Sequence, residues 1–233
     1  MVSRPDIANA LAQAAREINA PRDIGATLDA IVETARGSLP GIDHVGITLA
    51  HRDGTMETVA ATDQLVWDLD AVQYKFGEGP CVHAIETADV IVVENASQES
   101  RWPRFMAEAV QRGLRAQMGI RLYTDEKTLG GLNMYSLECD TFEPGTQELA
   151  ELFATHAALA LGRARIEDEL TTALNTRGLI GQALGLLMAR YHMDNERAFQ
   201  YLVRVSSHSN MKLRDVAAEV VEQHLARIQP SED

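Results

Sequence analysis

After Pro144-Gly145 the hydrophobic pattern of this chain becomes helical throughout, and this limits what the chain can fold into. Before it, helical stretches are mixed with short runs of β-branched residues that are typical of strands. After it, no segment carries a strand pattern. A chain of 233 residues is long enough for one or two domains. We therefore expect a mixed domain followed by an all-helical part.

The first part combines amphipathic helices with two hairpin patterns. The first hairpin turns at Asp53-Gly54, a dipeptide typical of tight turns. The stretch that follows it, as far as Tyr74, can be helical or irregular. We therefore expect an α+β domain with an antiparallel sheet flanked by helices. The expected helices are 6–19, 23–39, 81–87 and 101–112, and the expected strands are 44–50, 56–61, 90–93, 117–123 and 129–137.

A long helix is expected over about 146–175, overlapping the end of the first domain. Its apolar residues recur at spacings of three and four, as the a and d positions of a coiled coil do. For the first half, packing on the domain's own sheet through Phe153, Ala157, Ala160 and Ala164 is an equal alternative. Beyond the sheet, a parallel contact with a second copy is favoured. The residues expected to form this homodimer contact are Leu159, Ile166, Leu170 and Ala173.

Three apolar stripes then predict a small helical bundle over 171–229. The first helix is expected at Arg177–Tyr191. Asp194 suits the cap of the second helix because its side chain can accept hydrogen bonds from the free N–H groups of the first turn. The polar run Ser206–Asn210 is expected to separate the second helix from the third.

The charge is distributed unevenly along the chain. The net charge is −13, and residues 1–170 contain 14 basic and 27 acidic residues, whereas residues 171–233 contain seven of each. This asymmetry fits two modules with different tasks. The neutral C-terminal part offers no broad basic surface of the kind that binds nucleic acid without selectivity.

Several classes of protein are disfavoured by the motifs that the sequence lacks. It has no run of 18 apolar residues and no secretory signal pattern, so we expect no membrane segment and a cytoplasmic location. Cys81 and Cys139 are too far apart in sequence to indicate a zinc site or a disulfide framework. No phosphate-binding loop, nucleophile elbow or zinc-protease motif occurs. We predict no metal and no cofactor, and do not expect an enzyme.

Three blocks of the C-terminal part resemble the ANTAR family. They are Arg177–Arg190, Glu196–Arg204 and a third block that contains Ser207, Asn210 and Lys212–Ala217. The resemblance implies a three-helix RNA-binding domain that binds paired hairpins in nascent leader transcripts as a dimer, and thereby prevents a terminator from forming. Leu184 is a departure, because many members have lysine at this position, and the departure puts affinity or target choice in doubt.

RNA loops are recognised through unstacked bases, so their partner needs short polar groups, a few cations and close backbone approach. On spacing alone, the polar segment 207–214 can equally be such an RNA site or an ordinary turn between two helices. The resemblance to the ANTAR family favours the RNA site. Three glycines at 178, 181 and 185 fit either the approach of an RNA backbone or close helix packing. The expected RNA-binding residues are Arg177, Gln182, Ala183, Ser207, Asn210, Lys212 and Arg214.

Residues 1–165 resemble a GAF domain, on the segments Gly77–Cys81, Arg101–Pro103 and Gly131–Tyr135. The resemblance implies a sensor module for a small molecule whose identity the sequence does not reveal. Each candidate for the ligand pocket is also a plausible core residue; the candidates are Trp67, Tyr74, Cys81, Trp102 and Phe105.

Two other functions stay open at this point. The last two helices could form a DNA-binding helix-turn-helix, although the expected break of about five residues without glycine is unlike its usual short turn. Alternatively, Cys81 lies at the N-terminus of an expected helix and could be a reactive thiol in a GAF enzyme such as a methionine sulfoxide reductase, provided that Cys139 approaches it. A buried core thiol is the favoured interpretation of Cys81.

Overall fold

The computed structural model describes residues 16–18, 20, 23–51, 53–87, 90–124 and 127–228. The chain forms two compact units, residues 1–166 and residues 167–233, and each is described here by itself. Most of the helix expected over 6–19 lies outside the described residues. No helix of the described part is both long and apolar enough to cross a membrane.

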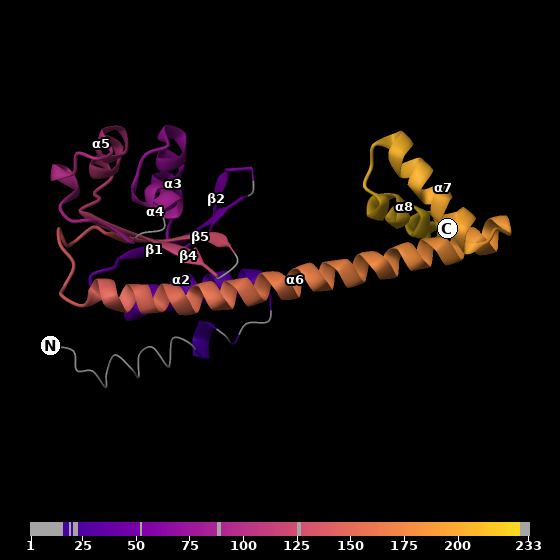
Figure 1. Cartoon of the computed structure of the whole chain (residues 1–233), viewed down its shortest axis with the longest axis horizontal. Coiled ribbons are helices and arrows are strands. Elements are labelled where there is room, and N and C mark those ends of the chain that lie inside the picture. Colours follow the sequence, from indigo (N-terminus) through magenta and orange to yellow (C-terminus); the bar gives the residue numbers. More distant parts are fainter. Residues whose placement is uncertain are drawn as a thin grey trace, which may run out of the picture. The chain divides into compact units, whose positions relative to one another are not determined.

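The first unit is built on a five-stranded antiparallel sheet of order β2-β1-β5-β4-β3 (Figure 1). The predicted α+β class is confirmed, and both predicted hairpins, β1–β2 and β4–β5, form. The strands are β1 (His44–Ala50), β2 (Met56–Ala61), β3 (Val90–Val93), β4 (Ala116–Tyr123) and β5 (Thr128–Ser136).

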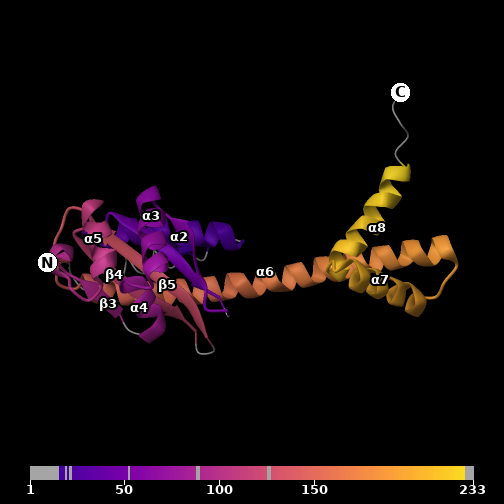
Figure 2. The same cartoon turned by 90° about the horizontal axis from the view of Figure 1, so that it is seen from above.

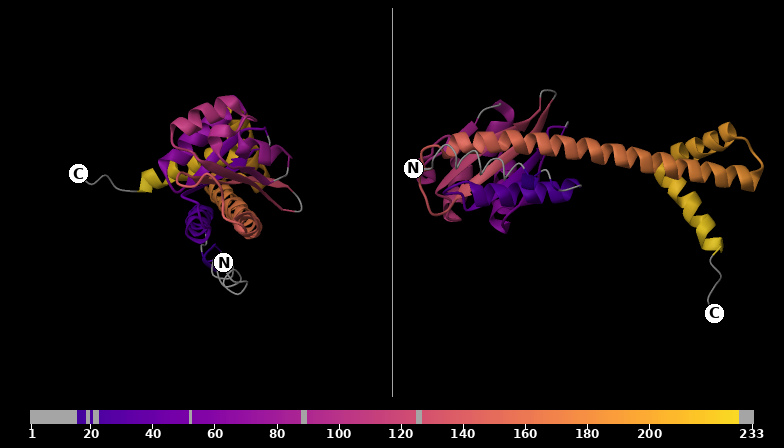
Figure 3. Two further views of the ribbon diagram at one scale, coloured as in Figure 1. Left: turned by 90° about the vertical axis from the view of Figure 1, so that its left-hand side faces the viewer. Right: turned by 90° about the horizontal axis from the view of Figure 1, so that it is seen from below.

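Helices cover both faces of this sheet. The first core cluster lies on the face that packs on α2 (Ile24–Ser38) and on the beginning of α6 (Thr146–Tyr191), which run side by side in Figure 3. The opposite face is covered by three further helices, seen from above in Figure 2. They are α3 (Gln64–Phe76), α4 (Pro80–Thr87) and α5 (Pro103–Gln111), with the short 3-10 helix η1 (Ala96–Gln98) before α5.

The alternation of side chains along each strand decides which core they enter. In β5, Leu132 and Met134 belong to the first core, whereas Tyr135 belongs to the second. For the first half of α6, packing on its own sheet, one of two equal alternatives, is observed, because Phe153, Ala157, Ala160 and Ala164 are all buried.

Three helices of the first unit begin at residues other than those expected. Helix α4 begins at Pro80 and not at Cys81, and local contacts account for the other two. The carboxylate of Asp23 accepts a hydrogen bond from the backbone N–H of Ala26 at 2.9 Å, so α2 begins at Ile24. Helix α5 begins at Pro103 and not at Arg101, because proline is suited to the first helical position, where its missing N–H is not needed.

The second unit is a three-helix arrangement of the end of α6, α7 (Asn195–Ser209) and α8 (Leu213–Ile228). As predicted, Asp194 caps α7, accepting a hydrogen bond from the backbone N–H of Arg197 at 2.8 Å. The buried residues of this third core come from all three helices: Ala183, Leu187, Ala198, Leu202, Val216 and Ala217.

The sequence-based helix boundaries in this unit need two corrections. The segment 177–191 is not a separate helix, since α6 continues without a break from Thr146 and contains no proline. Helix α7 extends through Ser209, so the break before α8 is Asn210–Lys212 and not Ser206–Asn210. Asn210 ends α7 in the left-handed conformation, while the Ser209 hydroxyl donates to the Val205 carbonyl inside the helix.

Gly130 in β5 allows the central strands to pair. A Cβ atom at this position would lie 1.8 Å from the carbonyl oxygen of Thr48 in β1. No side-chain rotation can relieve a clash with backbone, so any larger residue must push the two strands apart.

We therefore predict that Gly130→Ala lowers the free energy of unfolding of the first unit by about 3 kcal/mol. Gly37→Ala, in α2, is the matched control, because a Cβ there meets nothing within 4 Å. Urea unfolding followed by tryptophan fluorescence checks this, since Trp67 and Trp102 both lie in the first unit. Equal free energies of unfolding for the two variants would show that a Cβ atom at residue 130 does not force the strands apart.

Candidate functional site

A buried polar network lies on the sheet face that α3 and α4 cover. At its centre the Asp70 carboxyl group is fully buried. It accepts hydrogen bonds from the Thr58 hydroxyl at 2.7 Å and the Gln73 amide at 3.0 Å. The Tyr135 hydroxyl and the Asn133 amide also donate to it. The four donors come from three elements, β2, α3 and β5, so the network ties segments far apart in sequence to this side chain.

The network continues to Cys81 and Tyr74. The Cys81 thiol donates to the Thr48 hydroxyl at 3.3 Å, and the Asn133 amide donates to the sulfur at 3.0 Å. The hydroxyl group of Tyr74 lies 2.8 Å from that of Thr48 and also reaches Thr58. Tyr74 and Cys81, both candidates for a ligand pocket, are thus brought together in one hydrogen-bonded layer.

Burial without a neighbouring cation controls the pKa values in this layer. Desolvation raises the pKa of Asp70 to about 6, against four hydrogen bonds that lower it. Desolvation, and then the charge of Asp70, raises the pKa of the Cys81 thiol to about 12. The same burial raises the pKa of Tyr74 and of Tyr135.

Cys81 is therefore a protonated core thiol and not an activated nucleophile. The thiolate is the reactive form of cysteine, and a raised pKa removes it at neutral pH. Cys81 is buried while Cys139 is exposed, and both are free. The hypothesis of a thiol-based enzyme gains no support from this geometry.

Two amides on this face of the sheet keep unused hydrogen-bonding capacity. Within the described part of the chain, the side-chain oxygen and nitrogen of Gln117 and the Oδ1 atom of Asn133 are buried and have no partner. Gln117 is paired with Tyr135 across β4 and β5, so its side chain points to the same face as the network. Buried amides are normally hydrogen-bonded, so the unpaired atoms of Gln117 and Asn133 set this face apart from an ordinary core.

The remaining pocket candidates lie in different environments. Trp102 and Phe105 are buried in the second core. Trp67, on α3, is 39% exposed. The Trp102 ring packs edge-on against His83, with 5.7 Å between the ring centroids. The Arg101 guanidinium lies over the Trp102 ring, 4.4 Å from its centroid.

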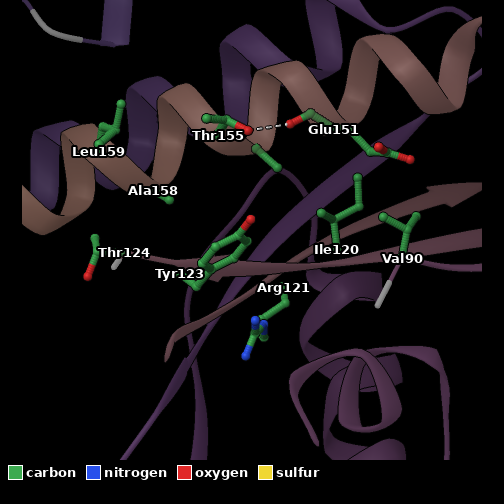
Figure 4. Close-up of a pocket in the computed structure, with 10 residues that line it drawn as sticks. Val90, Ile120, Arg121, Tyr123, Thr124, Glu151, Thr155, Ala158 and Leu159 are labelled. Atoms are coloured by element: carbon green, nitrogen blue, oxygen red, sulfur yellow. Dashed lines mark hydrogen bonds between the residues drawn. The ribbon is translucent and has the colours of Figure 1, made fainter. Parts of the chain in front are cut away.

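A cavity of about 380 Å³ lies instead between β3, β4 and α6 (Figure 4). Its volume falls within the about 300–1,000 Å³ typical of small-molecule sites. In Figure 4, Tyr123 lies on the strand side of the cavity and Thr155 on the helix side, and the Arg121 guanidinium lies 4.6 Å from the centroid of the Tyr123 ring. No pattern in the sequence indicated this cavity, because it forms where one helix diverges from a strand. It is lined by Val90, Ile120, Arg121, Tyr123, Thr124, Glu151, Ala154, Thr155, Ala158 and Leu159.

In the second unit, the predicted RNA-binding residues fall into two groups. Ser207, Asn210, Lys212 and Arg214 are all exposed and lie along the turn between α7 and α8. Lys212 directly precedes α8, and the Arg214 guanidinium lies 3.1 Å from the Asp215 carboxylate.

The other three predicted residues lie on α6. Arg177 and Gln182 are exposed, but Ala183 is fully buried in the third core. The expectation that the Ala183 side chain contacts RNA therefore does not hold. Leu184 is partly buried against the same core, so the leucine that departs from the family pattern has a packing role here.

The three glycines of α6 at 178, 181 and 185 face open space within this chain. A Cβ atom at any of them would meet nothing within 4 Å. Close packing against another helix of this chain is thus excluded for the described residues. Close packing against a helix of a second copy and approach of an RNA backbone are both compatible with this open space.

Because Asp70 ionises at different pH values in the folded and unfolded states, the free energy of unfolding of the first unit depends on pH. The folded protein holds this proton up to about pH 6, whereas the unfolded chain releases it near pH 3.8. Protonation therefore favours the folded state, and the contribution of Asp70 to the free energy of unfolding falls by about 3 kcal/mol as pH rises from about 4 to 6.

Asp70→Asn should abolish this slope. Urea unfolding at pH 4, 5, 6 and 7, followed by tryptophan fluorescence, should show that the difference in stability between wild type and variant shrinks or reverses as pH rises. Subtracting the two curves removes the carboxylates that titrate elsewhere, such as Glu78, whose pKa is lowered by Arg104. A difference that stays constant with pH would show that Asp70 ionises normally.

Solved structures share the fold of the first unit at low sequence identity. The GAF domain of a Coxiella burnetii phosphoenolpyruvate-protein phosphotransferase is 21% identical with a TM-score of 0.57, covering 72% of this chain and 99% of its own. The corresponding Acinetobacter domain is 15% identical with a TM-score of 0.55, covering 70% of this chain and 97% of its own. A Stigmatella aurantiaca phytochrome photosensory core module is 14% identical with a TM-score of 0.60; the match covers 87% of this chain but 45% of that one.

No curated protein matches the chain. Two domain families do. The GAF domain family matches residues 21–162, which is more than half of the chain, and the ANTAR domain family matches residues 168–221. The first match covers the sheet and the helices on both of its faces, and the second covers most of the three-helix unit. The chain therefore belongs to the GAF domain family and carries a C-terminal ANTAR domain, a pairing that marks a regulator.

Proposed function

We propose that this protein is a transcription antitermination regulator that binds paired hairpins in nascent leader RNA as a homodimer, under control of its GAF domain. The observation that carries the proposal is the ANTAR match over residues 168–221, together with the polar turn between α7 and α8. A protein that binds nascent bacterial-type leader transcripts acts in the cytoplasm. The functional domains proposed are a sensor over 1–165, a linking helix over 146–175 and an RNA-binding module over 171–229.

The α7–α8 turn has the chemistry that an RNA loop requires. Lys212 is exposed and forms no ion pair with any described residue. Ser207 and Asn210 add short polar groups, and the first turn of α8 presents backbone N–H groups that favour a phosphate. Because the unit has no net positive surface, a few contacts of this kind must supply its selectivity.

An exposed apolar stripe on α6 supports pairing with a second copy. Its members recur at intervals of seven and four residues, and each is at least 48% exposed. No described element of the chain covers them, and a helix with such a seam is typically buried against an identical one. Ala173 is exposed beside the stripe. The stripe consists of Leu152, Leu159, Ile166, Leu170 and Leu174.

The sensing function rests on the first unit. Two places there could hold a small molecule: the cavity beside α6 and the unsatisfied amides of Gln117 and Asn133. The cavity borders Leu159, a member of the exposed stripe, so a ligand bound in it would contact the helix proposed to form the dimer.

Binding to duplex DNA is the second candidate function. The break between α7 and α8 is three residues, Asn210–Lys212, and not the five expected from sequence. The length of the break therefore no longer argues against a helix-turn-helix. The acidic Glu219 and Glu222 on α8 oppose its insertion into a groove lined by phosphates. The binding experiments therefore include duplex DNA as a competing ligand for comparison.

Lys212→Glu should weaken binding to a tandem-hairpin leader RNA by about tenfold or more and reduce the slope of log K against log salt by about 0.7–0.9, because one phosphate contact is lost. Lys127→Glu makes the same charge change at an exposed site in the first unit and should leave both quantities unchanged. Filter binding at several salt concentrations measures them. Equal effects of the two substitutions would show that net charge, and not the α7–α8 turn, controls binding.

Ile166→Asp combined with Leu170→Asp should dissociate the dimer, because four charges would face one another across the seam. Thr171→Asp with Asn175→Asp places the same charges at the same spacing on the opposite side of α6 and should leave the dimer intact. Sedimentation velocity distinguishes the two. A dimer that survives the first pair of substitutions would contradict pairing through this stripe.

A further inference from the structure

A small crevice opens where the three helices of the second unit meet, apart from the α7–α8 turn. Arg190 and Tyr191 border it from the end of α6, Tyr201 from α7, and Val220, Gln223 and His224 from α8. Its volume is about 80 Å³. Pockets that enclose a metabolite hold about 300–1,000 Å³, so this crevice suits the edge of one planar group that a larger molecule presents.

Two tyrosine rings form the walls of the crevice. The ring centroids of Tyr191 and Tyr201 lie 6.5 Å apart, with the planes inclined by 35°. The two residues are 51% and 38% exposed, so each ring has surface free for a partner. Their hydroxyl groups make no hydrogen bond to any described residue. Both rings thus present apolar faces on which a planar group can stack.

Positive charge surrounds these rings on two helices. The Arg190 guanidinium lies over the Tyr191 ring, 5.3 Å from its centroid. On α7, Arg197 and Arg204 come four residues before and three residues after Tyr201, which places all three on one side of the helix. Arg190 and Arg204 form no ion pair with a described residue, and Arg197 has one contact of 3.7 Å with Asp194.

Polar groups that can distinguish one base from another complete the crevice. Gln223 offers an amide donor and acceptor, and His224 offers a ring nitrogen of either kind. Glu219 stands one turn before Gln223 on α8 and repels phosphate on that side. A nucleic-acid backbone that passes the crevice therefore runs along α7, beside Arg204.

We propose that this crevice captures one unpaired base of the RNA loop, stacked on Tyr201 and Tyr191, with the adjoining phosphates held by Arg190 and Arg204. The proposal rests on the proposed function, since it requires that the unit bind RNA hairpins. Aromatic faces flanked by arginines are the means by which proteins hold unstacked bases. A base within a duplex is already stacked and cannot enter, so the crevice selects loops over stems.

The full-length dimer and a hairpin leader RNA test the proposal in a double-mutant cycle. Tyr201→Ala should weaken binding by about 5- to 150-fold, the range found when a stacking residue is removed. Tyr201→Phe keeps the ring and should bind almost as well as wild type. Phe199→Ala is the matched control, since Phe199 is an equally exposed aromatic residue of α7 outside the crevice. Circular dichroism establishes that each variant is folded.

On the RNA side, each loop position is made abasic in turn. At one position, removal of the base should weaken wild-type binding by the same factor as Tyr201→Ala, and the two changes together should cost no more than either alone. The base-capture proposal would be overturned if Tyr201→Ala and base removal had additive effects on binding at every loop position. Equal losses of affinity for Tyr201→Ala and Phe199→Ala would also overturn it. Neither result would contradict hairpin binding itself. Failure of the wild type to prefer hairpins over duplex DNA and scrambled RNA would overturn the proposed function itself.

Discussion

Both units depend on one continuous helix, because α6 supplies buried side chains to the sheet of the first unit and to the three-helix core of the second. In the first unit, small residues such as Ala157 and Ala160 let the helix lie close against the sheet. In the second, Ala183 and Leu187 are the contribution of α6 to the core. A helix can bury one side in this way and still present another to solvent. The exposed stripe from Leu152 to Leu174 is that other side, and it is the reason to expect a second copy.

The buried carboxyl group of Asp70 is a second physical constraint on the first unit. A carboxyl group that is completely buried without a cation among the groups that shift its pKa is unusual, and it persists here because four donors converge on it. The same arrangement keeps Cys81 protonated. Burial thus raises the pKa of Asp70 to about 6 and leaves neighbouring amide atoms without a partner among the described residues. The raised pKa of the Cys81 thiol argues against a thiol-based enzyme.

Periodicity predicted much of the fold because strands alternate and helices repeat locally. β1, β2 and β3 have the bounds that the sequence indicated, and the Asp194 cap lies where its side chain predicted. The errors came from the parts that local patterns do not control. Nothing in the residues around Arg177 indicates whether two adjacent helices join. Ser206–Ser209 resemble a turn in sequence, but the Ser209 hydroxyl donates to the Val205 carbonyl inside the helix. The burial of Ala183, the cavity beside α6 and the tyrosine crevice all depend on how separate segments meet, which no spacing along one segment encodes.

The central claim is that this chain changes the fate of a transcript by holding a hairpin, and single-round transcription in vitro tests it most directly. A template whose leader encodes paired hairpins overlapping a terminator is transcribed with and without the purified full-length protein. The account predicts more read-through with the protein, and no gain when the loop sequences are replaced while the stems are kept. Read-through that does not rise, or that rises equally on the template with replaced loops, would contradict it.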